Sequence, residues 1–188
     1  MISISIMTID VYVINLFAND VKPYQWGFSY VGAIFLLMLC IPNIIWSKNV
    51  PKNYNEYVKQ EKKILVILER VGEVFVTCVA LCFKDFNLHI TKTSDGIIVP
   101  ARTYYLILVL LLMILYEMFW IRYFKSEKTM KDFYSSIFGI PLAGATLPVI
   151  AAFILGVYGM NLAMVIAVIV LGIGHIGIHY QHYRGLEH

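Results

Sequence analysis

The stretch "LAMVIAVIVLGIGHIGIHYQH", residues 162–182, is apolar over most of its length and ends in three histidines. A run of about 20 apolar residues is what an α-helix needs to cross the ~30 Å hydrocarbon core of a bilayer. The stretch therefore predicts a transmembrane helix. His175, His179 and His182 follow one another at spacings of four and three, so they share one face of that helix.

The composition of the whole chain supports this interpretation. Of its 188 residues, 60% are hydrophobic and 14% are charged, and the mean hydropathy is +0.73. Soluble domains carry about a quarter charged residues, so this chain has too little polar surface to dissolve. We therefore predict an all-α, polytopic transmembrane helical bundle that forms a single domain, residues 1–185. Residues 186–188 resemble the remnant of a histidine tag, so we expect them to have no role in the function.

Five spans are expected, and they cover residues 26–46, 64–83, 104–121, 137–158 and 162–182. Residues 1–25 mix apolar residues with aspartates and asparagines, which fits a segment at the membrane interface better than a span. No basic segment precedes the first apolar residues, so we do not expect a cleaved signal peptide.

Lysine and arginine predict the orientation, because they are more frequent in cytoplasmic connections. Ten follow the first and third spans or the last one: Lys48, Lys52, Lys59, Lys62, Lys63, Arg122, Lys125, Lys128, Lys131 and Arg184. Four lie on the opposite side: Lys22, Lys84, Lys92 and Arg102. The ten mark the cytoplasm, which places the N-terminus outside and the C-terminus inside, in agreement with an odd number of spans.

The connections carry local signals of their own. Both cytoplasmic connections are expected to hold short amphipathic helices on the inner leaflet, where lysines meet anionic lipids. Pro51 is a natural first helical residue, and Thr129 with Asp132 three residues later resembles a capping box. On the other side, the turn signal TSDG at residues 93–96 lies between two β-prone stretches and predicts a small hairpin.

Ionisable side chains inside the predicted spans are the candidate functional residues, because each costs about 2.5–3.5 kcal/mol on insertion scales. They are Glu69, Arg70, Glu73, Glu117, His175 and His179, with His182 at the boundary. With a rise of 1.5 Å per residue, all of them lie within roughly 15 Å of the predicted inner surface. We therefore expect a polar Glu/His site in the cytoplasmic half of the bundle that binds a ligand or protons.

Two chemistries suit such a site. Imidazole and carboxylate groups bind Zn²⁺ or a similar divalent metal, and His175, His179 and Glu73 form the candidate metal set. The same groups suit a proton relay, since histidine titrates near neutral pH. The HxxxH pair lacks the Glu of HExxH, so a metalloprotease is not indicated. We expect His175 to contact Glu73 or Glu117. In the purely structural alternative, Arg70 neutralises one of these carboxylates.

The fourth predicted span contains small residues that favour helix packing. Gly139 and Ala143 lie four residues apart, beside Pro141, and we expect both to allow a close helix contact. Val149 is expected to face outward. Small-residue faces of this kind can also pack against a second copy of the chain, so the sequence is compatible with a homo-oligomer. The chain holds no nucleotide motif and its basic residues are dispersed, so membrane lipids rather than nucleic acids are the expected partners.

Four stretches, "IPNIIW" (41–46), "ERVGEVFV" (69–76), "SEKTMKDFYSSIFGIPLAGATLPV" (126–149) and "GIGHIGIH" (172–179), resemble a group of small multi-pass bacterial membrane proteins without a known activity. The resemblance covers most of the chain beyond residue 40 and implies a location in the bacterial cytoplasmic membrane. It brings no substrate and no catalytic residue. The residues favour a protein that binds or transports a small molecule or ion. An accessory membrane protein without catalysis and a lipid- or isoprenoid-modifying enzyme are the alternatives.

Overall fold

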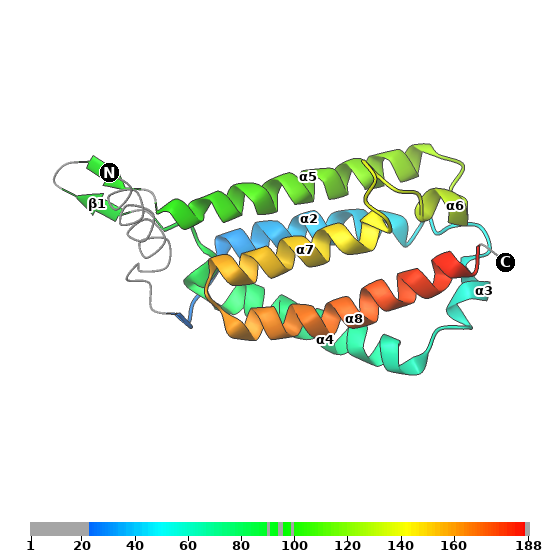
Figure 1. Ribbon diagram of the computed structural model, residues 1–188, viewed down its shortest axis with the longest axis horizontal. Helices are drawn as coiled ribbons and strands as arrows, with labels where there is room; N and C mark the ends of the chain where they lie inside the picture. The colour runs from blue at the N-terminus through cyan, green and yellow to red at the C-terminus, as the bar shows by residue number, and fades with distance from the viewer. Residues whose placement is uncertain (1–22, 90, 94–95, 99, 187–188) are drawn as a thin grey trace, which may run out of the picture.

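The computed structural model describes residues 23–89, 91–93, 96–98 and 100–186. In this part of the chain, seven α-helices form an elongated bundle, and a two-stranded hairpin lies at one end (Figure 1). The predicted all-α class is confirmed. Most of the expected interfacial segment, residues 1–22, and the end of the expected tag remnant, residues 187–188, lie outside the described residues.

The bundle consists of the longer helices α2 (Tyr30–Trp46), α4 (Lys63–Cys82), α5 (Tyr104–Lys125), α7 (Ala143–Tyr158) and α8 (Leu162–Arg184). Helices α2, α5 and α8 run toward one end of the molecule, and α4 and α7 return (Figure 1). The main contacts are those of α4 with α8, α5 with α7, and α7 with α8. Their buried side chains form a hydrophobic core that extends through the bundle.

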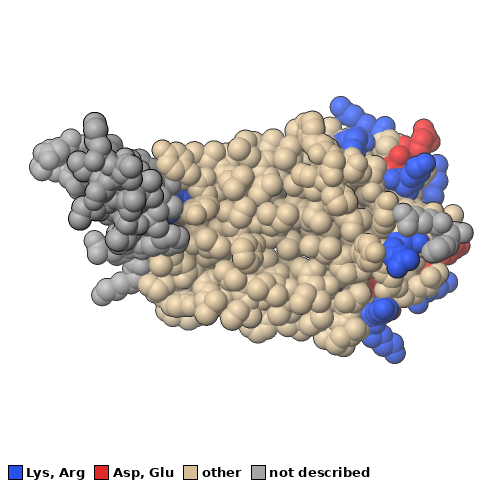
Figure 2. All heavy atoms as spheres, in the orientation of Figure 1, with Lys and Arg blue, Asp and Glu red and all other residues tan. Residues whose placement is uncertain are grey.

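By length and composition, α5 with 22 residues and α8 with 23 residues can each cross a membrane. Helices α2 and α7 are apolar but shorter, with 17 and 16 residues. Helix α4 has 20 residues and carries Glu69, Arg70 and Glu73 in its apolar sequence. On the face shown in Figure 2, few charged side chains lie along the bundle, whereas lysine, arginine and acidic residues gather at the end that carries the short helices.

Two short helices lie in the connections at this charged end, as predicted. Helix α3 (Tyr54–Val58) begins later than Pro51 indicates. The cause is Asn53, which has a left-handed backbone with φ 64° and therefore delays the first helical turn. At the opposite end, strands β1 (Thr91–Thr93) and β2 (Gly96–Ile98) pair in antiparallel fashion, which confirms the predicted hairpin.

Helix α6 (Met130–Phe133) begins with the predicted capping box. The Asp132 backbone N–H donates to Thr129 Oγ1 at 3.1 Å, and the Thr129 backbone N–H donates to Asp132 Oδ2 at 2.9 Å. The hydrogen bond from the Thr129 backbone N–H, followed by that from the Thr129 hydroxyl to Asp132 Oδ2 at 2.7 Å, holds the Asp132 pKa below its ordinary value of 3.8. The cap thus fixes the start of the connection that leads to α7.

Replacing Asp132 with Ala should lower the free energy of unfolding by about 1 kcal/mol at pH 7, because the Thr129 backbone N–H loses the carboxylate that accepts its hydrogen bond in the capping box. The pKa of the folded state is depressed, so this stabilisation is present above pH 3.8 and disappears as the pH falls further. Thermal unfolding in detergent at pH 7 and at pH 3 measures both effects. The matched control is Lys131→Ala on the exposed side of α6. An equal loss for both variants at pH 7 would contradict the role of the cap.

The fourth predicted span begins later than expected. Ile137 and Ile140 form a bridge, and helix α7 starts only at Ala143. Gly139 with φ +80° and Leu142 with φ 49° both have left-handed backbones, which interrupt a helix. A Cβ on Gly139 would meet nothing within 4 Å, so its predicted role in close packing is wrong. Ala143, in contrast, is fully buried.

The turn between α7 and α8 is tight, and its glycine, Gly159, is needed for space rather than for a left-handed backbone. Met160 adopts the left-handed conformation with φ 49°, whereas Gly159 has φ −75°. A Cβ on Gly159 would lie 2.8 Å from the Phe86 ring, so the position requires glycine for space. Asn161 then caps α8 by accepting a hydrogen bond from the Met164 backbone N–H at 3.0 Å.

Candidate functional site

Helices α4 and α8 approach each other closely because glycines line their contact. A Cβ on Gly174 would lie 2.3 Å from the backbone nitrogen of Glu69, and a Cβ on Gly72 would lie 2.4 Å from Leu171 Cα. Real Cβ atoms do not come so near to a neighbouring backbone. The contact therefore depends on the absence of side chains at both glycines, and it places the Glu69 carboxylate beside α8.

His175 contacts Glu69 across this interface. Its Nδ1 atom donates a hydrogen bond to Glu69 Oε1 at 2.6 Å, and the two side chains are 25% and 14% exposed. The prediction that His175 contacts Glu73 or Glu117 is therefore wrong. Glu73 Oε2 accepts a hydrogen bond from Arg70 Nη1 at 2.8 Å instead, as the structural alternative predicted.

Glu117 lies apart from this contact. Its helix, α5, packs mainly against α7 and α2 rather than against α8. The Glu117 side chain is half-buried, and within the described residues it forms no hydrogen bond or ion pair. Of the predicted site residues, the structure thus brings together Glu69, His175 and His179.

A second polar contact surrounds His182 at the end of α8. The Tyr134 hydroxyl lies 2.8 Å from His182 Nδ1, and Glu61 Oε1 lies 3.2 Å from Nε2. The rings of Tyr54 and Tyr57 stand against the imidazole at centroid distances of 5.7 and 5.8 Å. His182 is 2% exposed, so protein covers it, in contrast to the expected position at the membrane interface.

Tyr134 and Glu61 approach the two ring nitrogens of His182. Burial raises the Tyr134 pKa, so the phenol keeps its proton at neutral pH. The hydroxyl shares a hydrogen bond with His182 Nδ1 in which either group can donate, and the other ring nitrogen, Nε2, faces Glu61. This nitrogen has no aligned hydrogen-bond partner, although Glu61 Oε1 is near. Burial also raises the Glu61 pKa, which favours proton binding at this carboxyl group.

His179 lies between the two contacts. Its ring centroid is 4.5 Å from that of His175 and 5.6 Å from that of Tyr134. A continuous row of polar side chains thus leads from the α4–α8 interface to the charged end of the bundle. We call this row the histidine chain, and its members are Glu69, His175, His179, Tyr134, His182 and Glu61.

The predicted metal set is not brought together. His175 and His179 are neighbours, but Glu73 belongs to the ion pair with Arg70. Across the described ranges, no three or more His, Cys, Asp or Glu side chains are grouped so that they hold a metal ion.

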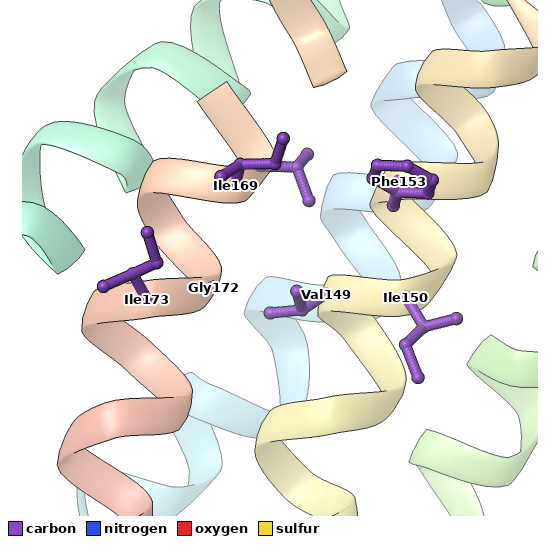
Figure 3. Close-up of a pocket in the computed structure, with 7 residues that line it drawn as sticks. Val149, Ile150, Phe153, Ile169, Gly172 and Ile173 are labelled. Carbon is purple, nitrogen blue, oxygen red and sulfur yellow. The ribbon is translucent and has the colours of Figure 1, made fainter. Parts of the chain in front are cut away.

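Two cavities lie away from the histidine chain. One, of about 260 Å³, is a groove between α7 and α8 whose walls are entirely hydrocarbon (Figure 3). Val149 lines this groove and packs against the core, so the prediction that it faces outward is wrong. The other cavity, of about 310 Å³, lies near the turn between α7 and α8 and includes Arg102.

No protein-family model matches the chain, and no curated protein or solved structure matches it either.

Proposed function

We propose that the chain is an integral protein of the bacterial cytoplasmic membrane that crosses it five times through α2, α4, α5, α7 and α8, with its C-terminus inside. Three observations support this topology: the alternating directions of these helices, the exposed hydrophobic side chains with few charges along the bundle, and the ten basic residues at one end. The shorter helices α2 and α7 span about 24–26 Å at 1.5 Å per residue, and their flanking turns complete the crossing.

Reporter fusions test this topology. A reporter fused after residue 185 should be active only in the cytoplasm, and one inserted in the hairpin between α4 and α5 only outside. The opposite pattern, or activity on the same side at both positions, would contradict it.

We propose further that the histidine chain binds and passes protons in a protein that binds or transports a small molecule or ion. The observation that carries this proposal is the 2.6 Å contact of His175 with Glu69 inside the bundle, which the row of rings continues to Glu61 at the charged end. Imidazoles accept and release protons near neutral pH, and a carboxyl group at each end of the row supplies a terminal proton site.

The exposed pair of Arg70 and Glu73 shows what a purely structural arrangement looks like on the same helix. These two side chains neutralise each other within one turn and are 70% and 43% exposed. The histidine chain differs, because it joins three segments of the sequence and leaves His182 Nε2 without an aligned hydrogen-bond partner among the described residues. An accessory protein without such a path is the alternative, in which the polar groups only hold the helices together.

Proton flux in proteoliposomes distinguishes the two functions. With a potassium diffusion potential and a pH-sensitive dye inside the vesicles, the wild type should carry protons faster than protein-free vesicles. Glu69→Gln should reduce that flux about tenfold or more, as expected when a positioned proton-transfer group is lost. Glu73→Gln is the matched control, since it lies one turn away on α4 and outside the chain. No flux above the protein-free vesicles, or equal flux from Glu69→Gln and the wild type, would favour the accessory protein.

A further inference from the structure

Arg102 is a buried cation at the end of the bundle opposite the histidine chain. It belongs to the short 3₁₀ turn η2 (Ala101–Thr103), which precedes α5, and it is 5% exposed. Burying a guanidinium is costly unless its charge is balanced and its donors are paired. The surroundings of Arg102 therefore indicate what balances it.

The protein satisfies only one side of this guanidinium. Its Nη1 atom donates to Met160 Sδ at 3.7 Å, and the group lies 5.8 Å from the Tyr158 ring centroid. The Nε and Nη2 atoms are buried and have no hydrogen-bond partner. Among the described residues, no carboxylate forms an ion pair with Arg102.

Asp85, a fully buried carboxylate at the same end, has other partners. Its Oδ1 atom accepts from the Gln25 backbone N–H at 2.8 Å. Its Oδ2 atom accepts from the Tyr24 backbone N–H at 2.8 Å and from Asn161 Nδ2 at 2.9 Å. Three donors therefore already accompany the Asp85 carboxylate, and among the described residues Arg102 has no paired anion.

The cavity beside Arg102 has a polar end and an apolar wall. It measures about 310 Å³, and its lining residues with polar side chains are Arg102, Tyr105 and Asn161. Its apolar wall comes from the end of α7 and the start of α8, through Gly156, Val157, Leu162 and Val165. Leu162 is 59% exposed, so this wall continues onto the outer surface of the bundle. A ligand that fits both parts has an anionic group joined to a hydrocarbon chain.

We propose that this cavity, the Arg102 cleft, binds the phosphate group of an anionic phospholipid. Arg102 lines the cavity, and its covered, unpaired Nε and Nη2 atoms form the planar fork with which arginine holds two oxygens of a phosphate once the side chain turns toward the ligand. An acyl chain lies along the apolar wall toward Leu162. The site is independent of the histidine chain, and it gives the protein a lipid ligand at its outward end.

Binding is measured on the purified, delipidated full chain in a neutral detergent. The probes are phosphatidylglycerol, diacylglycerol, which lacks the phosphate, and sodium phosphate, each followed by the thermal midpoint and by native mass spectrometry. Phosphatidylglycerol should raise the midpoint and stay bound in the mass spectrometer, whereas diacylglycerol should do neither. Equal binding of the two lipids would overturn the requirement for a phosphate group.

Two variants locate the site. Arg102→Gln should weaken phosphatidylglycerol binding about tenfold or more, because a bidentate charge-assisted contact is lost. Lys84→Gln, an exposed cation at the same end, is the matched control and should bind as the wild type does. Equal weakening by both variants, or no weakening by Arg102→Gln, would overturn the assignment.

A third variant retains Arg102 and tests the site even if Arg102→Gln does not fold. Leu162→Trp fills the apolar wall at an exposed position and should weaken phosphatidylglycerol binding while leaving the response to sodium phosphate unchanged. If Leu162→Trp binds phosphatidylglycerol as the wild type does, or sodium phosphate alone produces the full stabilisation, the lipid assignment is overturned.

Discussion

Gly174→Ala should lower the free energy of unfolding by about 3 kcal/mol, near the upper end of the usual cost of overpacking a core. The added methyl group would lie 2.3 Å from the Glu69 backbone nitrogen and 2.7 Å from the Leu65 carbonyl oxygen. A backbone cannot move aside as a flexible side chain does, so α4 and α8 must separate along their contact. Unfolding with a denaturing detergent, added to protein in mild detergent, measures the loss.

Gly177→Ala is the matched control, one turn further along the same helix. Its methyl group would meet only side-chain atoms of Leu65, the nearest at 3.1 Å, and a change of rotamer removes that contact. Alanine is also the better helix former, by about 1 kcal/mol. The stability of this variant should therefore stay within about 1 kcal/mol of the wild type. Equal stability of the two variants would mean that the closeness of α4 and α8 is not required.

Much of the fold could be predicted because its signals are local. The apolar run of residues 162–182 corresponds to α8, and the turn signal at residues 93–96 lies in the hairpin. Thr129 and Asp132 predict their capping box for the same reason, since both partners are three residues apart. The start of α7 could not be predicted this way. Gly139 and Pro141 are residue types that interrupt helices, but the left-handed conformations of Phe138 and Leu142 occur in residues that rarely adopt them, so residue type does not place the helix start at Ala143.

The candidate site could be predicted only in part, because its partners depend on how two helices rotate against each other. Glu69 and Glu73 lie one turn apart and are equivalent from sequence alone. The contact of Gly174 with the Glu69 backbone decides between them, and Glu73 then pairs with Arg70. Gly72 on α4 and Gly174 on α8 are the sequence signal for this contact, because a close approach of two helices requires glycine at the point where they touch.

Glu61 and Tyr134 were missed because they lie in connections rather than in spans. A search for ionisable residues within apolar runs excludes both of them. Tyr54 and Tyr57, in the same connection as Glu61, are a sequence signal for this contact, because several tyrosines in a polar connection indicate that it packs against the bundle. Their rings cover His182, which explains why that histidine is buried at the end of its helix.

Replacing Glu69 or His175 with Ala should lower the free energy of unfolding by about 2–3 kcal/mol in each case. Removing one partner of a fully buried ion pair costs about 3–5 kcal/mol, because the other is left without compensation. The lower range applies here, since the two side chains are 14% and 25% exposed. The control is the exposed pair of Lys52 and Glu127 at the charged end, whose charged atoms are 3.9 Å apart and whose side chains are 68% and 88% exposed. Each of their Ala variants should lose no more than about 1 kcal/mol.

The double variant shows whether the two residues act together. If His175 and Glu69 depend on each other, the second substitution removes a group that the first has already left unpaired. The double variant should then cost less than the sum of the single variants by about 1–2 kcal/mol. The Lys52/Glu127 cycle should show a coupling of about 0.5 kcal/mol at most, as surface pairs do. Strictly additive losses at Glu69 and His175 would mean that the 2.6 Å contact holds no shared charge or proton. The three histidines would then be only the polar end of a helix, and the proton path from the bundle to Glu61 would lose its first step.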